Sequence, residues 1–372
     1  FCDLYLVVFR DMKQFYLKEG DALEHSRKNA GSKARNDVET ILDKAGFEPV
    51  DVVIPYKKVD TISGAVKTTL SNYRFWKQQL RGLGAGDKVL MQFPPRSHSA
   101  LFPRLIRALR KRGVVVTFLI HDLETMRYRD TSELPLMKRM RIYLEETRLI
   151  RTADFIICHN DKMKGYLMSK GLSGSSLIPL GIFDYLTGFD PEAGDVDREP
   201  DGERNRVIIA GNLSPEKCVY LTDLGKVDGV RFNLYGVGYE DLGQENVTYM
   251  GSFLPDELVG ELRGDFGLVW DGTSIETCSG NFGNYLRLND PHKLSLYLTA
   301  GIPVVVWEEA AVADFVRKEH VGVAVASLTE LKDKLVALTA NDYEEMRQNA
   351  LRISRMTRSG HYLTTAISRG LQ

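Results

Sequence analysis

Residues 281–307, NFGNYLRLNDPHKLSLYLTAGIPVVVW, predict a loop, one helix and one buried strand. Asp290 is a good N-cap residue, and Pro291 suits the first position of a helix. Apolar side chains then recur at helical spacing as far as Gly301, and residues 302–307 form a short, β-rich apolar run. We therefore expect one helix followed by a strand of a buried sheet.

The predicted helix carries a lysine in its first turn, where unpaired backbone N–H groups point outward. The helix dipole disfavours a cation there by about 0.3–1 kcal/mol. Lys293 therefore needs either an anion in front of it or an exposed position. One interpretation is a diphosphate held by the helix N-terminus and the Lys293 ammonium. The other is a capped helix with a solvated lysine, in which Asp290 competes for the same N–H groups. The residues alone leave both open.

The longer run of residues 271–307, DGTSIETCSGNFGNYLRLNDPHKLSLYLTAGIPVVVW, resembles the nucleotide-sugar domain of a bacterial GT-B glycosyltransferase family. That family includes β-1,6-galactofuranosyltransferases and the glucosyltransferase that extends GlcNAc on serine-rich-repeat adhesins. The resemblance covers about residues 205–325 and is weaker in the N-terminal half. There, IHDLETMRY (120–128) and NAGSKARNDVETIL (29–42) look like loops of the family.

The resemblance implies an α/β protein of the GT-B class, with two Rossmann-like domains whose parallel sheets face a central cleft. We expect an acceptor-binding domain over residues 1–188, an acidic linker over 189–204 and a nucleotide-sugar domain over 205–340. Helices in residues 341–372 would cross back to the first domain. The implied activity is a UDP-sugar-dependent, inverting, metal-independent hexosyltransferase. It would transfer galactofuranose, galactose or glucose to a cell-surface glycan or glycoconjugate precursor.

Composition fits a globular protein, with 43% hydrophobic and 27% charged residues. The four cysteines lie far apart and form no CxxC pair, which favours reduced thiols in a cytoplasmic protein (Cys2, Cys158, Cys218 and Cys278). The opening FCDLYLVVF is too short to span a bilayer and lacks the basic region of a signal peptide. We expect a cytoplasmic location, with peripheral attachment to the inner face of the membrane left open.

The charge is unevenly distributed along the chain. Residues 1–180 hold 31 Lys and Arg against 20 Asp and Glu, whereas the remainder holds 18 against 30. The first half is therefore expected to face something anionic, such as a membrane surface. Two basic stretches, 104–112 and 138–151, mix bases with apolar residues as an interfacial helix would. The alternative is a solvated helix face whose apolar side lies in the core. Nucleic acid is a poorer explanation, because no aromatic platform or helix-turn-helix pattern accompanies the bases.

In the first half, strand and helix patterns alternate, which predicts a parallel sheet with ligands beyond the carboxyl ends of its strands. The strand VVVTFLI ends in His121 and Asp122, and either could act as general base on an acceptor hydroxyl. Equally, both could serve only local hydrogen bonds. A long polar loop over residues 10–36 is expected to precede a helix that begins at Asp37. Within it, Gly31, Ser32 and Lys33 form a candidate acceptor-side loop.

In the second half, three predicted strands end at one rim, close to the start of the Lys293 helix. Gly after a strand lets a ligand approach the backbone. The G-x-G at 236–238 lacks a third glycine, so it is only a weak dinucleotide fingerprint. Eight residues make up the UDP-sugar-binding set that these strand ends and the resemblance imply: Gly211, Asn212, Tyr235, Gly236, Asp271, Asn284, His292 and Lys293.

We expect no cofactor and no metal. Asp195-Val196-Asp197 mimics a DxD metal motif, but it lies in a charge run and not after a buried strand. The expected partners are a UDP-sugar donor and a lipid-linked glycan or glycoprotein acceptor, with self-association left open. Two alternative functions remain at this point: a non-catalytic glycosyltransferase-like partner subunit and, less favoured, a nucleotide-binding oxidoreductase.

Overall fold

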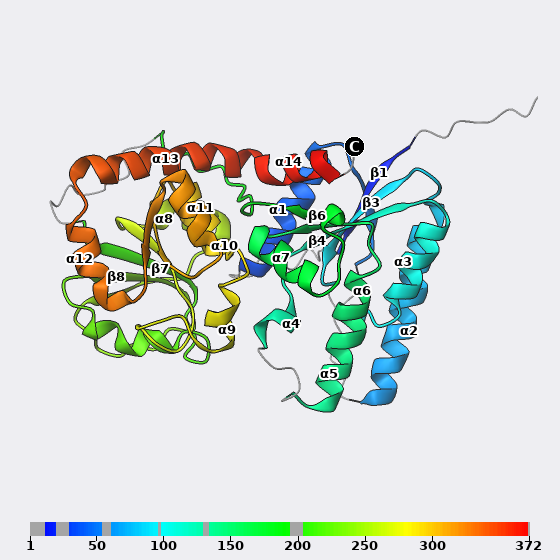
Figure 1. Ribbon diagram of the computed structural model, residues 1–372, viewed down its shortest axis with the longest axis horizontal. Coiled ribbons are helices and arrows are strands. Elements are labelled where there is room, and N and C mark those ends of the chain that lie inside the picture. Colours follow the sequence, from blue (N-terminus) through cyan, green and yellow to red (C-terminus); the bar gives the residue numbers. More distant parts are fainter. Residues whose placement is uncertain are drawn as a thin grey trace, which may run out of the picture.

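The computed structural model describes residues 12–19, 30–53, 61–95, 98–128, 134–193 and 204–370. These residues form two lobes, each built on a six-stranded parallel sheet (Figure 1). The N-terminal sheet has the order β2-β1-β3-β4-β5-β6. Its strands are β1 (Gln14–Lys18), β2 (Glu48–Asp51), β3 (Lys88–Phe93), β4 (Val115–Ile120), β5 (Phe155–Cys158) and β6 (Leu177–Pro179).

The C-terminal sheet has the order β12-β11-β10-β7-β8-β9. Its strands are β7 (Arg206–Asn212), β8 (Arg231–Val237), β9 (Val247–Gly251), β10 (Phe266–Val269), β11 (Val304–Trp307) and β12 (Gly322–Val325). All residues of β10 and β11 are buried, as expected for central strands covered by helices on both faces. The predicted fold class, two Rossmann-like domains with parallel sheets, is confirmed.

Helices connect the strands and cover the sheets. In the N-terminal lobe they are α1 (Ala30–Lys44), α2 (Ile62–Gln79), α3 (Phe102–Lys111), α4 (Glu124–Arg127), α5 (Leu136–Ile142), α6 (Arg148–Ile150) and α7 (Asp161–Ser169). Then follow α8 (Pro255–Glu261), α9 (Gly280–Tyr285), α10 (His292–Thr299), α11 (Val312–Glu319), α12 (Leu331–Val336), α13 (Ala340–Ser359) and α14 (His361–Gly370). None of the described helices combines the length and the apolar character needed to cross a bilayer.

Several local predictions were wrong. Within the expected loop 10–36, residues 14–18 form β1 and residues from Ala30 onward form α1. The helix begins early because its apolar face, from Val38 to Leu42, packs on the sheet and outweighs the turn-forming residues before it. Ser214-Pro215 predicts a helix start, but the helix there is a 3₁₀ helix over Val219–Lys226. The polar run that follows Asp271-Gly272 up to Asn289 predicts a loop, but it contains α9. The apolar run of residues 2–9 also predicts a buried strand, and that segment lies outside the described residues.

The strand order identifies the place in each sheet where the connections between successive strands change direction. In the C-terminal sheet, β7 and β10 are neighbours, so the connections leave them toward opposite edges. In the N-terminal sheet the equivalent pair is β1 and β3. Ligands of such sheets bind beyond the carboxyl ends of the strands at this reversal. The topology therefore directs attention to the loops that follow β7 and β10.

The last two helices join the lobes. The helix α13 runs along the C-terminal lobe, and α14 continues onto the N-terminal lobe (Figure 1). Between them Gly360 adopts φ +77°, and a Cβ there would lie 2.8 Å from Ile41. Glycine therefore allows both the left-handed turn and the close approach of the two lobes. Apolar residues of α14, Leu363 and Ile367 among them, belong to the same buried cluster as Ile41.

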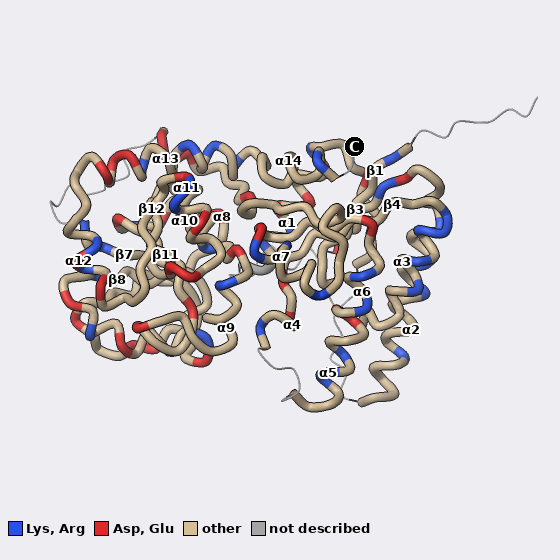
Figure 2. Tube along the Cα trace, viewed as in Figure 1, with Lys and Arg blue, Asp and Glu red and all other residues tan. Residues whose placement is uncertain are grey.

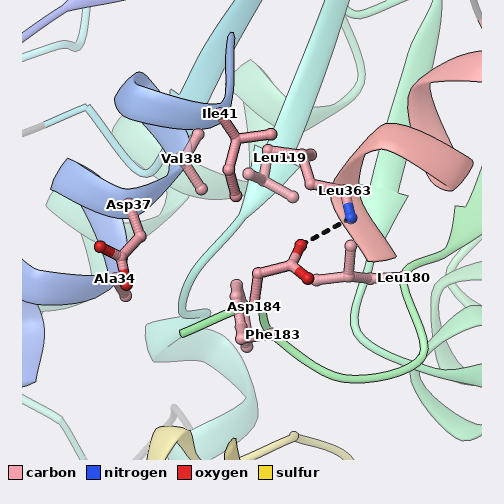
Figure 3. A pocket seen from close by; sticks show the side chains of 9 residues that line it. All are labelled: Ala34, Asp37, Val38, Ile41, Leu119, Leu180, Phe183, Asp184 and Leu363. Atoms are coloured by element: carbon pink, nitrogen blue, oxygen red, sulfur yellow. Dashed lines mark hydrogen bonds between the residues drawn. The ribbon is translucent and has the colours of Figure 1, made fainter. Parts of the chain in front are cut away.

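A short segment after β6, residues 181–186, also lies between the lobes. Asp184 accepts hydrogen bonds from the backbone N–H groups of Tyr362 and Leu363 and so holds the first turn of α14. Figure 3 shows Asp184 and Asp37 of α1 beside a cavity of about 10 Å³, the room needed by one water molecule. Burial raises the pKa of Asp184 to about 7 and that of Asp37 to about 6. The junction is therefore polar as well as apolar.

Candidate functional site

The rim of the C-terminal sheet is formed by the ends of β7, β8 and β10. Gly211 and Gly236 lie side by side at the ends of β7 and β8, where a Cβ on Gly236 would fall 1.8 Å from the Gly211 carbonyl oxygen. No side chain fits at position 236, so the backbone itself forms this part of the rim. Asn212 follows Gly211, and its side-chain oxygen accepts a hydrogen bond from the Ser214 N–H. Asp271 follows β10 on the other side of the reversal.

Lys293 turns back to this rim. Its ammonium donates to the Asp271 carboxylate at 2.9 Å and to the Trp270 carbonyl at 3.0 Å. Both members of the ion pair are nearly buried, with side chains 12% and 10% exposed. Burial works to lower the pKa of Lys293, but the Asp271 carboxylate and, to a lesser degree, Cys218 and Tyr297 raise it overall. The anion in front of Lys293 is thus a carboxylate of the protein, an arrangement that neither interpretation of the sequence included.

Asp290 does not cap helix α10, contrary to the prediction. The N-cap position is occupied by Pro291, and no side chain caps the helix. Asp290 is instead buried between the lobes, where its carboxylate accepts from the Asn160 amide at 2.6 Å. Its backbone N–H donates to Nδ1 of His159, whose Nε2 bonds the Ile120 carbonyl. Asn160 and His159 follow β5, so the N-terminal lobe holds the entrance of the α10 helix. The uncapped N–H groups of α10 keep the anion-binding interpretation open.

Asp290 gives a testable dependence of stability on pH. Burial raises its pKa to about 8, against a lowering effect of the Asn160 hydrogen bond. Because the folded pKa exceeds the unfolded value of about 4, this group stabilises the fold most at low pH, and the contribution is lost between about pH 4 and 8. Asp290→Asn keeps the acceptor for Asn160 and removes the titration. We expect the free energy of unfolding of the variant to fall less steeply over that range, by up to about 1.4 kcal/mol per pH unit.

The measurement is urea unfolding of both proteins at several pH values. The difference between the two curves isolates Asp290, because the other buried groups titrate equally in both proteins. Parallel curves from pH 4 to 8 would show that Asp290 ionises normally in the folded protein.

His292 lies in the first turn of α10, as predicted, but its imidazole faces residues 181–186 and not the sheet rim. Its ring centroid is 5.0 Å from that of Tyr185 and 6.0 Å from that of Phe183. The ring lies near the backbone of Asp184, but neither nitrogen makes a well-formed hydrogen bond with any described residue. Burial, and then the Lys33 charge, lower the pKa of His292 to about 4. The side chain is therefore a neutral, buried group between the lobes.

His121 and Asp122 lie at the carboxyl end of β4, as predicted. The His121 ring stacks on Phe183, and its Nε2 lies 2.7 Å from the side-chain oxygen of Gln92. Because the Gln92 amide nitrogen donates to Arg35 and Glu39, its oxygen is the acceptor, which places a proton on His121 Nε2.

Asp122 faces three donors, one of which is the Tyr285 hydroxyl of α9 in the opposite lobe. One carboxylate oxygen accepts from the backbone N–H of Leu123, and the other is paired with the Arg127 guanidinium. An ionised carboxylate has about four lone-pair positions, so about one remains open beside the three donors. The side chain is 32% exposed, so it is accessible from the space between the lobes.

Two cations that the sequence analysis did not single out meet at one aromatic ring between the lobes. The Arg127 guanidinium lies 5.7 Å from the centre of the Phe282 ring, and the Lys217 ammonium lies 5.8 Å from it. Lys217 comes from the turn after β7, and Phe282 comes from α9. The neighbouring Tyr285 of α9 accepts a hydrogen bond from Leu123 in the opposite lobe. The Asp122–Arg127 pair and Lys217 therefore face the same part of the space between the lobes.

Three of the remaining predicted site residues are buried. The Tyr235 hydroxyl accepts from the Arg263 N–H within the core of its own lobe. Ser32 and Lys33 are buried in the first turns of α1. The Lys33 ammonium bonds Asp37, the Leu186 carbonyl and Asp256, so it ties the lobes together.

The two other predicted residues lie on helices. Gly31 lies in the first turn of α1 and not in a loop. Asn284 is half-buried on α9, close to Phe282 in the chain.

The described residues also contain one further cavity and three cysteines. A cavity of about 340 Å³ in the N-terminal lobe is lined by Leu123 and Thr125, which follow Asp122, and by Glu146 and Tyr166. No group of three or more His, Cys, Asp or Glu side chains in the described ranges is arranged to hold a metal ion. The three described cysteines are buried and unpaired, and the Asp195–Asp197 motif lies outside the described residues.

Two family models match the chain. The glucosyltransferase 3-like N-terminal domain matches residues 20–182, and the glucosyltransferase 3-like C-terminal domain matches residues 207–369. The β-1,6-galactofuranosyltransferase WbbI of Escherichia coli K12 is 36% identical over 345 residues, which are 91% of this chain and 94% of that protein. Glucosyltransferase 3 of Streptococcus gordonii is 26% identical over 289 residues, covering 76% of this chain and 78% of that protein.

Solved structures share the two-lobed arrangement. Sucrose-phosphate synthase from Thermosynechococcus elongatus aligns with a TM-score of 0.59 at 13% identity, over 97% of this chain and 98% of that chain. The apo form of the lipopolysaccharide outer core galactosyltransferase WaaB aligns with a TM-score of 0.59 at 11% identity, over 96% and 99%. At such identities the likeness concerns the fold alone, and it agrees with the GT-B class.

Proposed function

This chain belongs to the glucosyltransferase 3-like family and is therefore a glycosyltransferase, and we propose that it transfers a hexose from a UDP-sugar, with inversion and without a metal. The acceptor would be a hydroxyl of a cell-surface glycan or glycoconjugate precursor. Family membership decides against the oxidoreductase alternative and against a non-catalytic subunit. Galactofuranose is the first sugar to test, because the relative named for its transfer is 36% identical over 91% of this chain.

The observation that carries the proposal is the convergence at Phe282. Lys217 on one lobe and the Asp122–Arg127 pair on the other face this ring from opposite sides of the space between the sheets. Glycosyl transfer needs a cation for the departing diphosphate and a base for the acceptor hydroxyl, on opposite sides of the anomeric carbon. Lys293 is already paired with Asp271. We therefore assign the role of diphosphate cation to Lys217, supported by the uncapped N-terminus of α10.

The proposed step proceeds as follows. The acceptor oxygen forms a bond to the anomeric carbon while Asp122 takes its proton. The bond between the anomeric carbon and the β-phosphate oxygen breaks, and its electron pair leaves with UDP. Negative charge grows on that phosphate, where Lys217 and backbone N–H groups stabilise it. His121, stacked on Phe183 and bonded to Gln92, positions the loop that carries Asp122.

The donor class is tested by thermal unfolding in the presence of UDP, ADP or GDP, each with EDTA. A ligand that binds only the folded state stabilises it by RT ln(1 + [L]/Kd), about 2.7 kcal/mol at a concentration of 100 Kd. We expect UDP to raise the melting temperature in EDTA and the other nucleotides to do so far less. Release of UDP from UDP-galactofuranose, UDP-galactose and UDP-glucose would then rank the sugars. No shift with UDP would refute the donor assignment.

Lys217→Ala tests the role given to this ammonium. We expect the UDP-induced shift to shrink and turnover to fall by about 10²-fold, because a preorganised charge at the leaving group is lost. Lys226→Ala is the matched control, since Lys226 lies on the same lobe, is 70% exposed and pairs with Asp223 away from the rim. Equal turnover in the two variants would remove Lys217 from the mechanism.

If the acceptor is a lipid-linked glycan, the protein would act at the inner face of an anionic membrane as a peripheral membrane protein. A glycoprotein acceptor is the alternative, and it would need no contact with lipid. The basic character of the first 180 residues favours the membrane.

A further inference from the structure

Large apolar side chains are exposed on the first halves of two helices of the N-terminal lobe. Seven of the fourteen exposed large apolar side chains among the described residues lie on α2 or on the helical stretch that begins with α5. On α2 they recur every fourth residue. The seven are Ile62, Val66, Leu70, Leu136, Met137, Met140 and Tyr143, with exposed fractions from 40% to 70%. We call them the apolar tip.

The tip is not the buried face of either helix. In α2 the buried residues are Asn72 and Trp76, in its second half, and Trp76 packs on Phe102 of α3. In α5 only Ile142, its last residue, is buried. Helix α3 behaves differently, because its apolar residues are buried and its bases form a solvated face. The two basic stretches of the sequence therefore differ. The bases of residues 104–112 lie on the solvated face of a core helix, whereas residues 138–151 also carry the exposed apolar side chains of Met140 and Tyr143.

The charge of helices α2 and α5 has one sign, and two acidic residues, Glu145 and Glu146, follow α5 in the same helical stretch. Neither α2 nor α5 contains an acidic residue, and both carry bases, including Lys67, Arg139 and Arg141. Figure 2 shows these helices with Lys and Arg positions and no Asp or Glu positions. Glu124 neutralises part of this charge, because it pairs with Arg141 and with Lys138. Two copies of the tip placed face to face would bring like charges together, whereas an anionic surface would complement them.

The tip also lies on the functional side of the N-terminal lobe. In a parallel sheet, the helix that follows a strand begins near the carboxyl end of that strand. Helix α2 follows β2, and α5 follows β4 through Asp122 and α4. In Figure 1 both helices extend away from the sheet toward the same edge of the molecule. The tip is thus on the side from which an acceptor would approach Asp122.

We propose that the apolar tip docks on the surface of an anionic lipid bilayer, with its apolar side chains in the headgroup region and its bases on the lipid phosphates. Exposed apolar residues combined with Lys and Arg are the pattern of helices that lie in a membrane interface. The inference rests on the proposed function in one respect: docking would serve to bring a lipid-linked acceptor to Asp122. The docking itself needs no catalysis.

The test is sedimentation with vesicles of phosphatidylcholine, with or without phosphatidylglycerol. We expect the protein to bind the anionic vesicles at low salt and to be released at high salt, which screens the charges. For the double variant Leu136→Glu/Met140→Glu, the partition coefficient onto the anionic vesicles should fall at least about tenfold. Val336→Glu is the matched control, because Val336 is 78% exposed on α12 of the other lobe, and its binding should equal that of the unchanged protein.

Each outcome has one meaning. Equal binding of the tip variant and the unchanged protein, or no binding of either, overturns the inference. A change from oligomer to monomer in the tip variant, with no lipid binding by the unchanged protein, would assign the tip to self-association. The UDP-induced thermal shift of the tip variant should equal that of the unchanged protein, which also shows that it is folded. If neither the tip variant nor the unchanged protein binds UDP, while the unchanged protein binds the anionic vesicles, the proposed donor is wrong and the docking inference stands.

Discussion

Asp122→Asn is expected to lower the transfer rate by about 10²–10⁴-fold, the usual contribution of a general base. The amide can still accept the hydrogen bond of the Leu123 N–H, but it cannot take a proton from the acceptor. The UDP-induced thermal shift should remain, because Asp122 lies on the lobe opposite the proposed nucleotide site. The measurement is turnover at saturating donor and acceptor.

Two further variants make this result decisive. Asp154→Asn is the matched control, because Asp154 precedes β5 at the opposite end of the sheet, where it pairs with Arg110. Its turnover should stay near that of the unchanged protein. His121→Asn should reduce the rate less than Asp122→Asn, as expected for a positioning residue. A larger loss of rate in His121→Asn than in Asp122→Asn would make His121 the base.

Lys293→Met should lower the free energy of unfolding by about 3–5 kcal/mol, the cost of leaving a buried charge without its partner. The uncompensated group is Asp271, whose side chain is 10% exposed. The double variant Lys293→Met/Asp271→Asn should recover much of that loss, because neither charge then remains. Urea unfolding, followed by tryptophan fluorescence and circular dichroism, measures all four members of the cycle. Additive effects of the two substitutions would show that the two residues do not stabilise each other.

This expectation differs from what the sequence predicts for Lys293. A solvated lysine would be removed without loss of stability, and a lysine that binds only the diphosphate would affect turnover alone. The buried pair with Asp271 makes Lys293 part of the structure that shapes the rim. Any loss of activity in Lys293→Met must therefore be compared with the double variant before it is assigned to catalysis.

The positions of the strands could be predicted because each central strand is a short apolar run bounded by polar residues, glycine or proline. The apolar runs 88–93 and 155–158 predict strands with those bounds, and β3 and β5 have them. The end of β4 at His121 and Asp122 follows from the same pattern. Strand β9 was missed because three of its residues, Thr248 to Met250, are exposed at the edge of the sheet, and the run does not resemble a buried strand.

The convergence at Phe282 could not be predicted from the sequence alone. It requires knowing that β7 and β10 are neighbours and that α9 packs against the opposite lobe, and local patterns do not contain this information. Lys217 could have been singled out as a base shortly after a strand end, but many such bases exist. Asp290 and Lys33 were misplaced for one reason: short-range signals for a cap and a loop were outweighed by long-range contacts between the lobes.

The path of α14 has a consequence for how the protein is made. The buried cluster on one side of the N-terminal sheet, which includes Ile41 and Leu42, contains Leu363 and Ile367. During synthesis on the ribosome, every other described element emerges before this helix does. Part of the hydrophobic surface of the first lobe therefore stays exposed to water until most of the second lobe has been synthesised. A nascent chain arrested before residue 360 should bind chaperones through that uncovered surface, although most of its own strands are already complete.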